Sequence, residues 1–121
     1  MEDALKALLS YQLPPGVLDY FELVSVEQEG EKLVLQLDEL NIKPLSDQDN
    51  DLESKGFLRS VLLEDFPIRE HTVYLLVRRR KWVDKQTGQT VTNAYNLSAE
   101  GTSYTREFGA FLKELAGHHP G

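Results

Sequence analysis

Apolar residues that alternate with polar ones restrict much of this chain to β structure. Residues 20–37 alternate, pass through a polar turn and alternate again, which is typical of an antiparallel hairpin. A second hairpin is predicted from residues 72–83 and 89–97, because Gly88 between them can supply the positive φ of a tight turn. A further β-like run covers residues 57–66. The pattern therefore predicts two hairpins and one additional strand.

Helical spacing marks both ends of the chain. Residues 1–12 end before Pro14 and predict a short helix that docks onto the fold through Ala4, Leu5, Leu8 and Leu9. A second helix is expected to begin at Thr102 or Ser103 and to stop at Gly117. Its predicted apolar face consists of Tyr104, Phe108, Phe111, Leu112 and Leu115. The expected fold class is α+β, with antiparallel β hairpins flanked by an N-terminal and a C-terminal helix.

The size of the chain suits one domain, since 121 residues with 40% hydrophobic content can form one core. We expect a single domain over residues 1–121, with a helix and hairpin in 1–40, an acidic loop in 41–54, and a ribbon-like hairpin with the C-terminal helix in 55–116. No apolar run approaches the roughly 18 residues of a membrane helix and no signal-peptide core is present, so the cytoplasm is the simplest location. Because the chain has no cysteine, burial must stabilise the fold without disulfides or a thiolate zinc site.

Charge is distributed unevenly along the chain. Residues 1–53 contain three Lys or Arg against thirteen Asp or Glu, a formal charge of −10, whereas residues 54–121 contain ten against seven. The overall charge of −7 disfavours nonspecific nucleic-acid binding, which depends on neutralising phosphates, but a local basic surface can still act at short range. The concentrated basic segment is 77–91, where four consecutive cations and a tryptophan precede a turn.

This basic segment carries the one arrangement with a binding chemistry. In a continuous strand, Arg78 and Arg80 share a face with Trp82, while Arg79 and Lys81 share the other. Arginine can pair with phosphate through two hydrogen bonds, and tryptophan can stack on a base. The structural alternative is an edge strand whose cations prevent aggregation, with Trp82 packed under the last helix.

Signals of catalysis are weak. The sequence contains no G-x-S-x-G nucleophile elbow and no G-x-x-x-x-G-K phosphate loop. Glu64–Asp65 and Glu70–His71 are adjacent pairs, but neighbours on a strand point to opposite faces and do not easily act on one atom. We therefore expect no enzymatic activity and no cofactor.

A set of segments in the C-terminal half occurs in the order of a known family. They are Gly56-Phe57, 65-DFPI-68, 73-VYLLVRRRKW-82, Gly88 and 97-LSAEGTSYTREFGAFLKEL-115. In this order they resemble the N-terminal region of insertion-sequence transposases, particularly those split over two reading frames. In one-chain relatives this region is a zinc ribbon with two cysteine knuckles.

The resemblance also indicates what this chain lacks. The second knuckle falls on residues 84–88, where Asp84 and Thr87 stand in place of thiolates, and the first falls on residues 43–46, which retain Pro44. Zinc in such a site is held by four soft or borderline ligands, which these residues do not supply. The resemblance therefore implies a zinc-ribbon-like fold without metal, in which packing replaces the lost zinc energy.

The function implied by the resemblance is accessory. Transposases of this kind cleave DNA with a carboxylate triad that holds two divalent metals, on an RNase H-like domain too large for this chain. The chain would be a noncatalytic N-terminal component of an insertion-sequence transposase that contributes to binding the element's DNA ends. The predicted DNA-binding residues are Arg78, Arg79, Arg80, Lys81 and Trp82, with Arg59 and Arg69 extending the patch.

Two other functions fit the same residues. One is a protein-interaction module that docks the catalytic transposase chain without direct DNA contact, using the acidic front half to mimic or exclude DNA. The other is a degenerate remnant without separate activity. The expected partners are therefore element DNA and a catalytic transposase chain, and no membrane.

Overall fold

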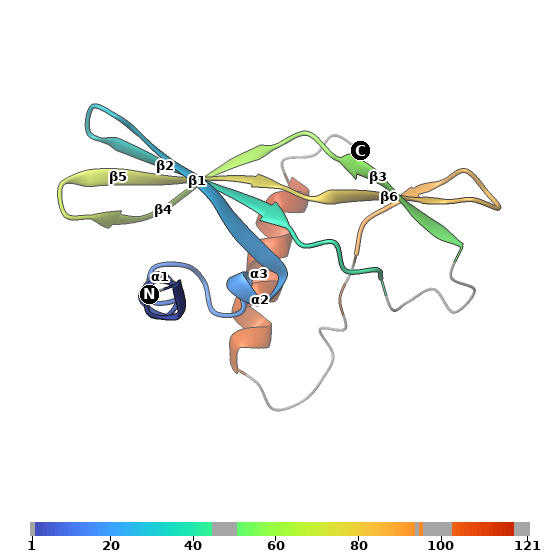
Figure 1. The fold of residues 1–121 in the computed structure, drawn as a ribbon, viewed down its shortest axis with the longest axis horizontal. Helices are drawn as coiled ribbons and strands as arrows, with labels where there is room; N and C mark the ends of the chain where they lie inside the picture. The colour runs from blue at the N-terminus through green and yellow to red at the C-terminus, as the bar shows by residue number, and fades with distance from the viewer. Residues whose placement is uncertain (1, 45–50, 94, 96–102, 118–121) are drawn as a thin grey trace.

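The computed structural model describes residues 2–44, 51–93, 95 and 103–117, and arranges them as two sheets with helices on one side (Figure 1). The four-stranded sheet has the order β1 (Phe21–Glu29), β2 (Lys32–Glu39), β5 (His71–Arg78) and β4 (Val61–Ile68). The three-stranded sheet has the order β3 (Leu52–Phe57), β6 (Arg80–Asp84) and β7 (Thr90–Val91). The helices in the described part are α1 (Glu2–Leu9), α2 (Val17–Tyr20) and α3 (Ser103–Gly117). The predicted α+β class, with antiparallel hairpins and a helix near each end, is confirmed.

A parallel strand pair joins the two hairpins of the four-stranded sheet. The predicted hairpin over residues 20–37 is confirmed as the antiparallel pair β1 and β2, and β4 and β5 form another antiparallel hairpin. Between them β2 and β5 run parallel, with Asp38 opposite Arg78 in the register. Because parallel strands end at the same edge of a sheet, the acidic end of β2 lies beside the basic end of β5.

The chain changes sheets at Arg79, which corrects the prediction of one strand over residues 72–83. β5 ends at Arg78 in the four-stranded sheet, and β6 begins at Arg80 in the three-stranded sheet. The backbone N–H of Leu58 donates to the Arg79 carbonyl at 2.8 Å, so the crossing residue is itself hydrogen-bonded. The alternation of apolar and polar residues continues through this crossing. For this reason the sequence does not predict the change of sheet at Arg79.

The predicted run over residues 57–66 is likewise divided between the two sheets. β3 ends at Phe57, and β4 begins at Val61 and continues through Pro67 to Ile68. Proline lacks the N–H of a central strand, but β4 is an edge of its sheet and its register shifts just before Ile68. The proline is therefore tolerated inside the strand rather than ending it.

Two further strand boundaries differ between the prediction and the structure. β3 begins at Leu52, inside the acidic loop predicted over residues 41–54. The return strand predicted over residues 89–97 is reduced to Thr90–Val91 in the described part, where Val91 pairs with Trp82. Residues 45–50, 94 and 96–102, over which the loop and this strand were also predicted, lie outside the described residues.

One apolar core fills the space between the four-stranded sheet and the helices. The strands contribute Phe21, Leu35, Leu37, Val61, Leu63, Val73, Leu75 and Val77. The predicted face of α3 is confirmed for Phe108, Phe111, Leu112 and Leu115, which are all buried, while the Tyr104 side chain lies outside the described part. The Phe111 ring meets the Phe21 ring edge to face at 5.6 Å between centroids. α3 therefore anchors the sheet as the sequence predicted.

The first helix does not bury the apolar side predicted for it. Leu5 is 57% exposed and Leu8 is 70% exposed, and Leu9 is only partly buried against the core. The chain instead reaches the core beyond the helix, through the fully buried Leu13 and Val17. The prediction that α1 docks through Leu5 and Leu8 is therefore wrong. No helix within the described residues is long and apolar enough to cross a membrane.

Candidate functional site

The basic segment lies at the junction between the two sheets, where Asp38 and Glu39 end strand β2. Arg78 sits opposite Asp38 in the parallel register, and the chain then crosses to Arg80 in β6. The residues of the junction come from four separate parts of the chain: Asp38 and Glu39 of β2, residues 78–80 at the β5–β6 crossing, Phe57 at the end of β3, and Asn93 with Tyr95. We refer to this group of residues as the junction cluster.

Arg78 forms a salt bridge with Asp38 on the side of the sheet away from the core. Its Nε and Nη2 atoms donate to the two carboxylate oxygens at 2.8 and 2.6 Å. The hydrogen bond from Arg78 holds the pKa of Asp38 below its usual range against the opposing effect of burial, and the same bond raises the pKa of Arg78. The Nε–Nη2 edge of the Arg78 guanidinium, which can also hold a phosphate through two hydrogen bonds, is therefore occupied by this carboxylate.

Arg79 is buried in the junction cluster. It is 8% exposed, and its Nη2 donates to Glu39 at 3.1 Å and to the backbone carbonyl of Asn93. Its Nε atom is buried without a hydrogen-bond partner. An internal guanidinium held by a carboxylate and a carbonyl cannot reach a ligand at the surface unless the junction opens.

Glu39 is the centre of the cluster. It is 2% exposed and accepts hydrogen bonds from Arg79, from the Tyr95 hydroxyl and, at 2.8 Å, from the backbone N–H of Arg80. Burial, together with the negative charge of Glu39, raises the pKa of Tyr95 well above its usual value. Tyr95 therefore stays a neutral donor, and it ties the segment before α3 to the end of β2.

Arg80 completes the junction from the side of β6. Its Nε donates to the backbone carbonyl of Glu39 at 3.1 Å. Its guanidinium carbon lies 4.6 Å from the centroid of the Phe57 ring, and that of Arg78 lies 3.9 Å from the same centroid. Arg78 and Arg80, which were expected to share a strand face with Trp82, both contact the Phe57 ring and the end of β2.

Trp82 is not placed for base stacking. It is 5% exposed, and its partner in the β3–β6 register is Ser54. Trp82 lies outside the main core cluster, so it does not pack there under the last helix as the structural alternative expected. Its ring shares the sheet face of Leu52, which is also buried outside that core.

The other predicted DNA-binding residues occupy different surroundings. Lys81 is half-buried on β6, and Arg59 is exposed in the link between β3 and β4. Arg69 is exposed in the turn between β4 and β5, at the opposite end of β5 from Arg78. Seven residue steps along a strand span about 23 Å, so Arg69 does not belong to the same patch.

The proposed position of the second knuckle is a turn held by its own hydrogen bonds. The Asp84 carboxylate accepts from the backbone N–H of Gln86 at 2.8 Å, and the Thr87 hydroxyl accepts from that of Gln89 at 3.2 Å. Gly88 has the predicted positive φ, 77°, and its N–H donates to the Asp84 carbonyl at 2.7 Å. Hydrogen bonds from backbone N–H groups to nearby polar side chains thus stabilise this turn. Among the described residues no group of three or more His, Asp or Glu side chains is placed to hold a metal ion.

Sequence reasoning missed the partners of the arginines. The sequence predicts no role for Asp38 and Glu39 beyond the acidic charge of residues 1–53, and it predicts that Tyr95 lies in the return strand over residues 89–97. Each lies at least 14 residues from its arginine, since Arg79 and Asn93 are 14 apart and Arg78 and Asp38 are 40 apart. The local signal that points to these partners is an acidic pair at the end of an apolar run.

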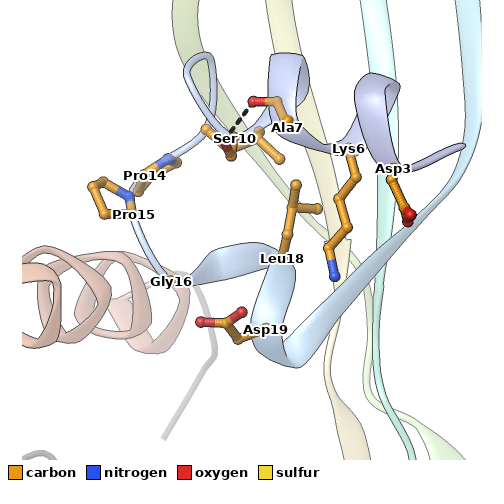
Figure 2. A pocket seen from close by; sticks show the side chains of 10 residues that line it. Asp3, Lys6, Ala7, Ser10, Pro14, Pro15, Gly16, Leu18 and Asp19 are labelled. Atoms are coloured by element: carbon orange, nitrogen blue, oxygen red, sulfur yellow. Dashed lines mark hydrogen bonds between the residues drawn. The ribbon is translucent and has the colours of Figure 1, made fainter. Parts of the chain in front are cut away.

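Two hollows flank α1. The larger, about 1040 Å³, lies between α1, the start of β1 and Ile68 at the end of β4. The smaller, about 480 Å³, lies between α1, the Pro14-Pro15 turn and α2. Figure 2 shows the side chain of Lys6 extending from α1 toward α2 beside Leu18. The helix therefore stands away from the fold on both sides. We refer to the larger hollow as the α1 groove.

Comparison with known proteins identifies no relative for this chain. It matches no protein-family model, no curated protein and no solved structure. The sequence resemblance and the two regions described above are therefore the grounds on which a function can be proposed.

Proposed function

We infer that this chain is a noncatalytic, cytoplasmic accessory component of an insertion-sequence transposase, and that it acts mainly by docking the catalytic chain. The family part of this proposal rests on the ordered segments between residues 56 and 115. The docking part rests on one observation about charge. The three arginines that suggested a DNA patch are held by Asp38 and Glu39.

The internal pairing changes what the basic segment can offer to DNA. DNA binding draws its energy from side-chain cations that replace the counterions condensed on the phosphates, and these cations must be accessible to do so. Arg79 is buried, and the Asp38 carboxylate neutralises Arg78 and occupies the Nε–Nη2 edge of its guanidinium. The segment therefore serves better as the connection that orients two sheets than as a DNA-contacting surface.

Catalysis would come from the partner chain. Transposition chemistry requires several carboxylates that converge on divalent metals. Within residues 2–44, 51–93, 95 and 103–117 no such group is present. Glu64 is exposed and Asp65 is half-buried with the Gln12 side chain 3.4 Å away, so these neighbours do not converge on one site.

The test is co-expression with the transposase encoded next to this frame. The tagged chain should retain that transposase on an affinity column after exhaustive nuclease treatment. Recovery of the transposase only when DNA is left intact would contradict docking, and absence of any transposase frame near this one would contradict the family assignment. The matched control is the same transposase passed over a column that carries an unrelated acidic domain of similar size.

Direct DNA contact is a second candidate, favoured by cations that lie away from the junction cluster. The alternation of β3 and β6 places Lys55 and Lys81 on one face of the three-stranded sheet, with Glu53 3.3 Å from the Lys55 ammonium. Arg59 and Lys85 are exposed at the ends of these strands. This surface is mixed in charge but contains the accessible cations of the sheet.

The DNA candidate needs variants that leave the junction cluster intact. A Lys55→Ala/Lys81→Ala double variant should weaken DNA binding and lower the slope of log affinity against log salt by roughly 1.5 to 2. Arg69→Ala, at the far end of the four-stranded sheet, is the control and should bind as the unmodified chain does. Equal binding by all three proteins would refute contact through this sheet.

A further inference from the structure

The α1 groove is lined mainly by apolar side chains, several of which are exposed to solvent. From α1 and the turn after it come Leu5, Leu8 and Tyr11, which are 57%, 70% and 90% exposed. Leu23 of β1 and Ile68 of β4 line the opposite wall. An isolated exposed leucine needs no explanation, but several large apolar side chains gathered around one hollow mark a surface that another molecule covers.

The helix that forms one wall has little to hold it in place. Eight residues are too few for a helix to be stable alone in water, so packing has to stabilise α1. In the described part its attachments are the partly buried Leu9, the buried Leu13 beyond its end, and the Gln12 side chain, which donates to the Phe66 carbonyl at 2.5 Å. An occupant of the groove would supply the packing that α1 lacks.

The charges around the groove indicate a cationic occupant. Asp3 and Glu22 line it, Asp19 lines the neighbouring hollow, and Glu27 is exposed farther along β1. Lys6 lines both hollows. This excess of carboxylates belongs to the half of the chain with a formal charge of −10. Acidic rims repel nucleic acid and anionic lipid, and they attract basic protein segments.

We propose that the α1 groove binds a positively charged amphipathic helix of a partner protein. The eight residues of α1 span about 12 Å, which matches two to three turns of a helix that presents apolar residues at positions i, i+3 or i+4, and i+7. Lysine or arginine on its flanks would face Asp3 and Glu22. Under the proposed function, the helix that binds belongs to the catalytic transposase chain. This identity of the partner rests on the proposed function. The preference for a basic amphipathic helix rests only on the residues of the groove.

The test uses the full-length chain and synthetic helices as probes. The first probe is an 18-residue peptide with leucines at helical spacing and lysines elsewhere. The second replaces every lysine with glutamate, and the third scrambles the leucine positions. Titration calorimetry should show binding of the first peptide, and binding of the second and third at least about tenfold weaker, because charge and the apolar stripe are both needed. Equal binding of the lysine and glutamate peptides would overturn the proposed chemistry.

Variants locate the contact. Leu8→Ser and, separately, Tyr11→Ser should each lower the affinity for the lysine peptide by about tenfold, since each removes one large apolar contact. Leu62→Ser is the matched control, because Leu62 is 52% exposed on the face of the sheet opposite the core. Circular dichroism establishes that each variant folds. Tyr11→Ser lies outside the helix and keeps the test valid if Leu8→Ser unfolds α1.

Other occupants give different results. A chain that dimerises by itself, and becomes monomeric on Leu8→Ser, would show that a second copy fills the groove and would overturn the proposal. Binding to vesicles that contain phosphatidylserine, lost in the same variant, would overturn it in favour of a membrane surface. If the lysine peptide binds as expected but the neighbouring transposase is not retained, the groove proposal stands and the proposed function fails.

Discussion

The junction cluster and the α1 groove differ in what they bury. At the junction, charged arginines and carboxylates lie inside or against the protein, and Arg79 and Glu39 are 8% and 2% exposed. At the α1 groove, leucines and a tyrosine face solvent, with Leu8 70% exposed. The segment that looks like a binding surface in the sequence is internal, while the segment that looks like core is external. Which surface a segment presents therefore depends on its partners in the fold more than on its composition.

The largest expected effect concerns the buried ion pair of the junction. Arg79→Met removes the guanidinium and leaves the Glu39 carboxylate buried without its cation, so the free energy of unfolding should fall by about 3–5 kcal/mol. Urea denaturation followed by circular dichroism measures this change. Adding Glu39→Gln to Arg79→Met should recover part of the loss, because the buried charge is gone while an acceptor for Tyr95 is kept.

The control for this prediction is Arg59→Met, which changes an exposed arginine of the same basic half. It should alter the free energy of unfolding by less than about 0.5 kcal/mol. Similar small effects at positions 59 and 79 would mean that Arg79 is accessible to solvent, and the DNA-binding role predicted from the sequence would regain support.

The second prediction compares leucines of the two helices. Leu115→Ala in α3 creates a cavity in the core and should lower the free energy of unfolding by about 2–5 kcal/mol, because Leu115 is fully buried. Leu8→Ala in α1 should cost less than about 0.5 kcal/mol, since the side chain is already exposed and alanine favours helix. The same denaturation experiment measures both. A loss at Leu8 as large as that at Leu115 would show that the free chain closes the α1 groove by itself.

The elements predicted correctly are those whose structure depends only on residues near one another in the sequence. The apolar face of α3 and the β1–β2 hairpin follow from spacing within about 15 to 20 residues, because each element buries one side. Gly88 was predicted as a turn residue from the absence of a Cβ, and its φ of 77° agrees. These elements need no information from elsewhere in the chain.

The rest of the fold and of the candidate site depends on residues that are distant in sequence. A run of alternating residues reads the same whether it stays in one sheet or crosses to another at Arg79, so the crossing has no local sign. Pairing of Asp38 with Arg78 requires the parallel contact between β2 and β5, 40 residues apart. Exposure of Leu8 depends on where the chain turns after Leu9, and helical spacing alone assigned it to the core.

The third prediction concerns the pH dependence of the exposed side of the junction. The pKa of Asp38 is lower in the fold than in the unfolded chain, so the unfolded state binds more protons as pH falls toward 4. The stabilisation from the Arg78 salt bridge is therefore complete above the unfolded pKa and is lost as pH falls through the lower folded value. Asp38→Asn should cost about 1 kcal/mol at pH 7, because Arg78 is partly exposed, and this difference should shrink in acid.

Urea denaturation between pH 7 and pH 2.5, with the variant and the unmodified chain run together, measures the pH dependence of that difference. Lys55→Ala, which removes an exposed pair with Glu53, is the control and should give a small, nearly constant difference. A difference for Asp38→Asn that stays constant down to pH 2.5 would contradict the pairing with Arg78.

The smallest effect is expected at Arg69, the predicted DNA-binding residue farthest from the junction along β5. Arg69 turns the β4–β5 hairpin with a φ of 58°, a conformation that is unfavourable for side chains with a Cβ. Arg69→Gly should raise the free energy of unfolding by about 0.5 kcal/mol, because relief of this strain exceeds the entropy that glycine adds to the unfolded chain. Glu70→Gly, beside it and without a positive φ, should lower the free energy by a similar amount. Changes in the free energy of unfolding of opposite sign at these two positions would show that the turn constrains position 69. Equal losses at both positions would mean that the positive φ of Arg69 does not destabilise the fold.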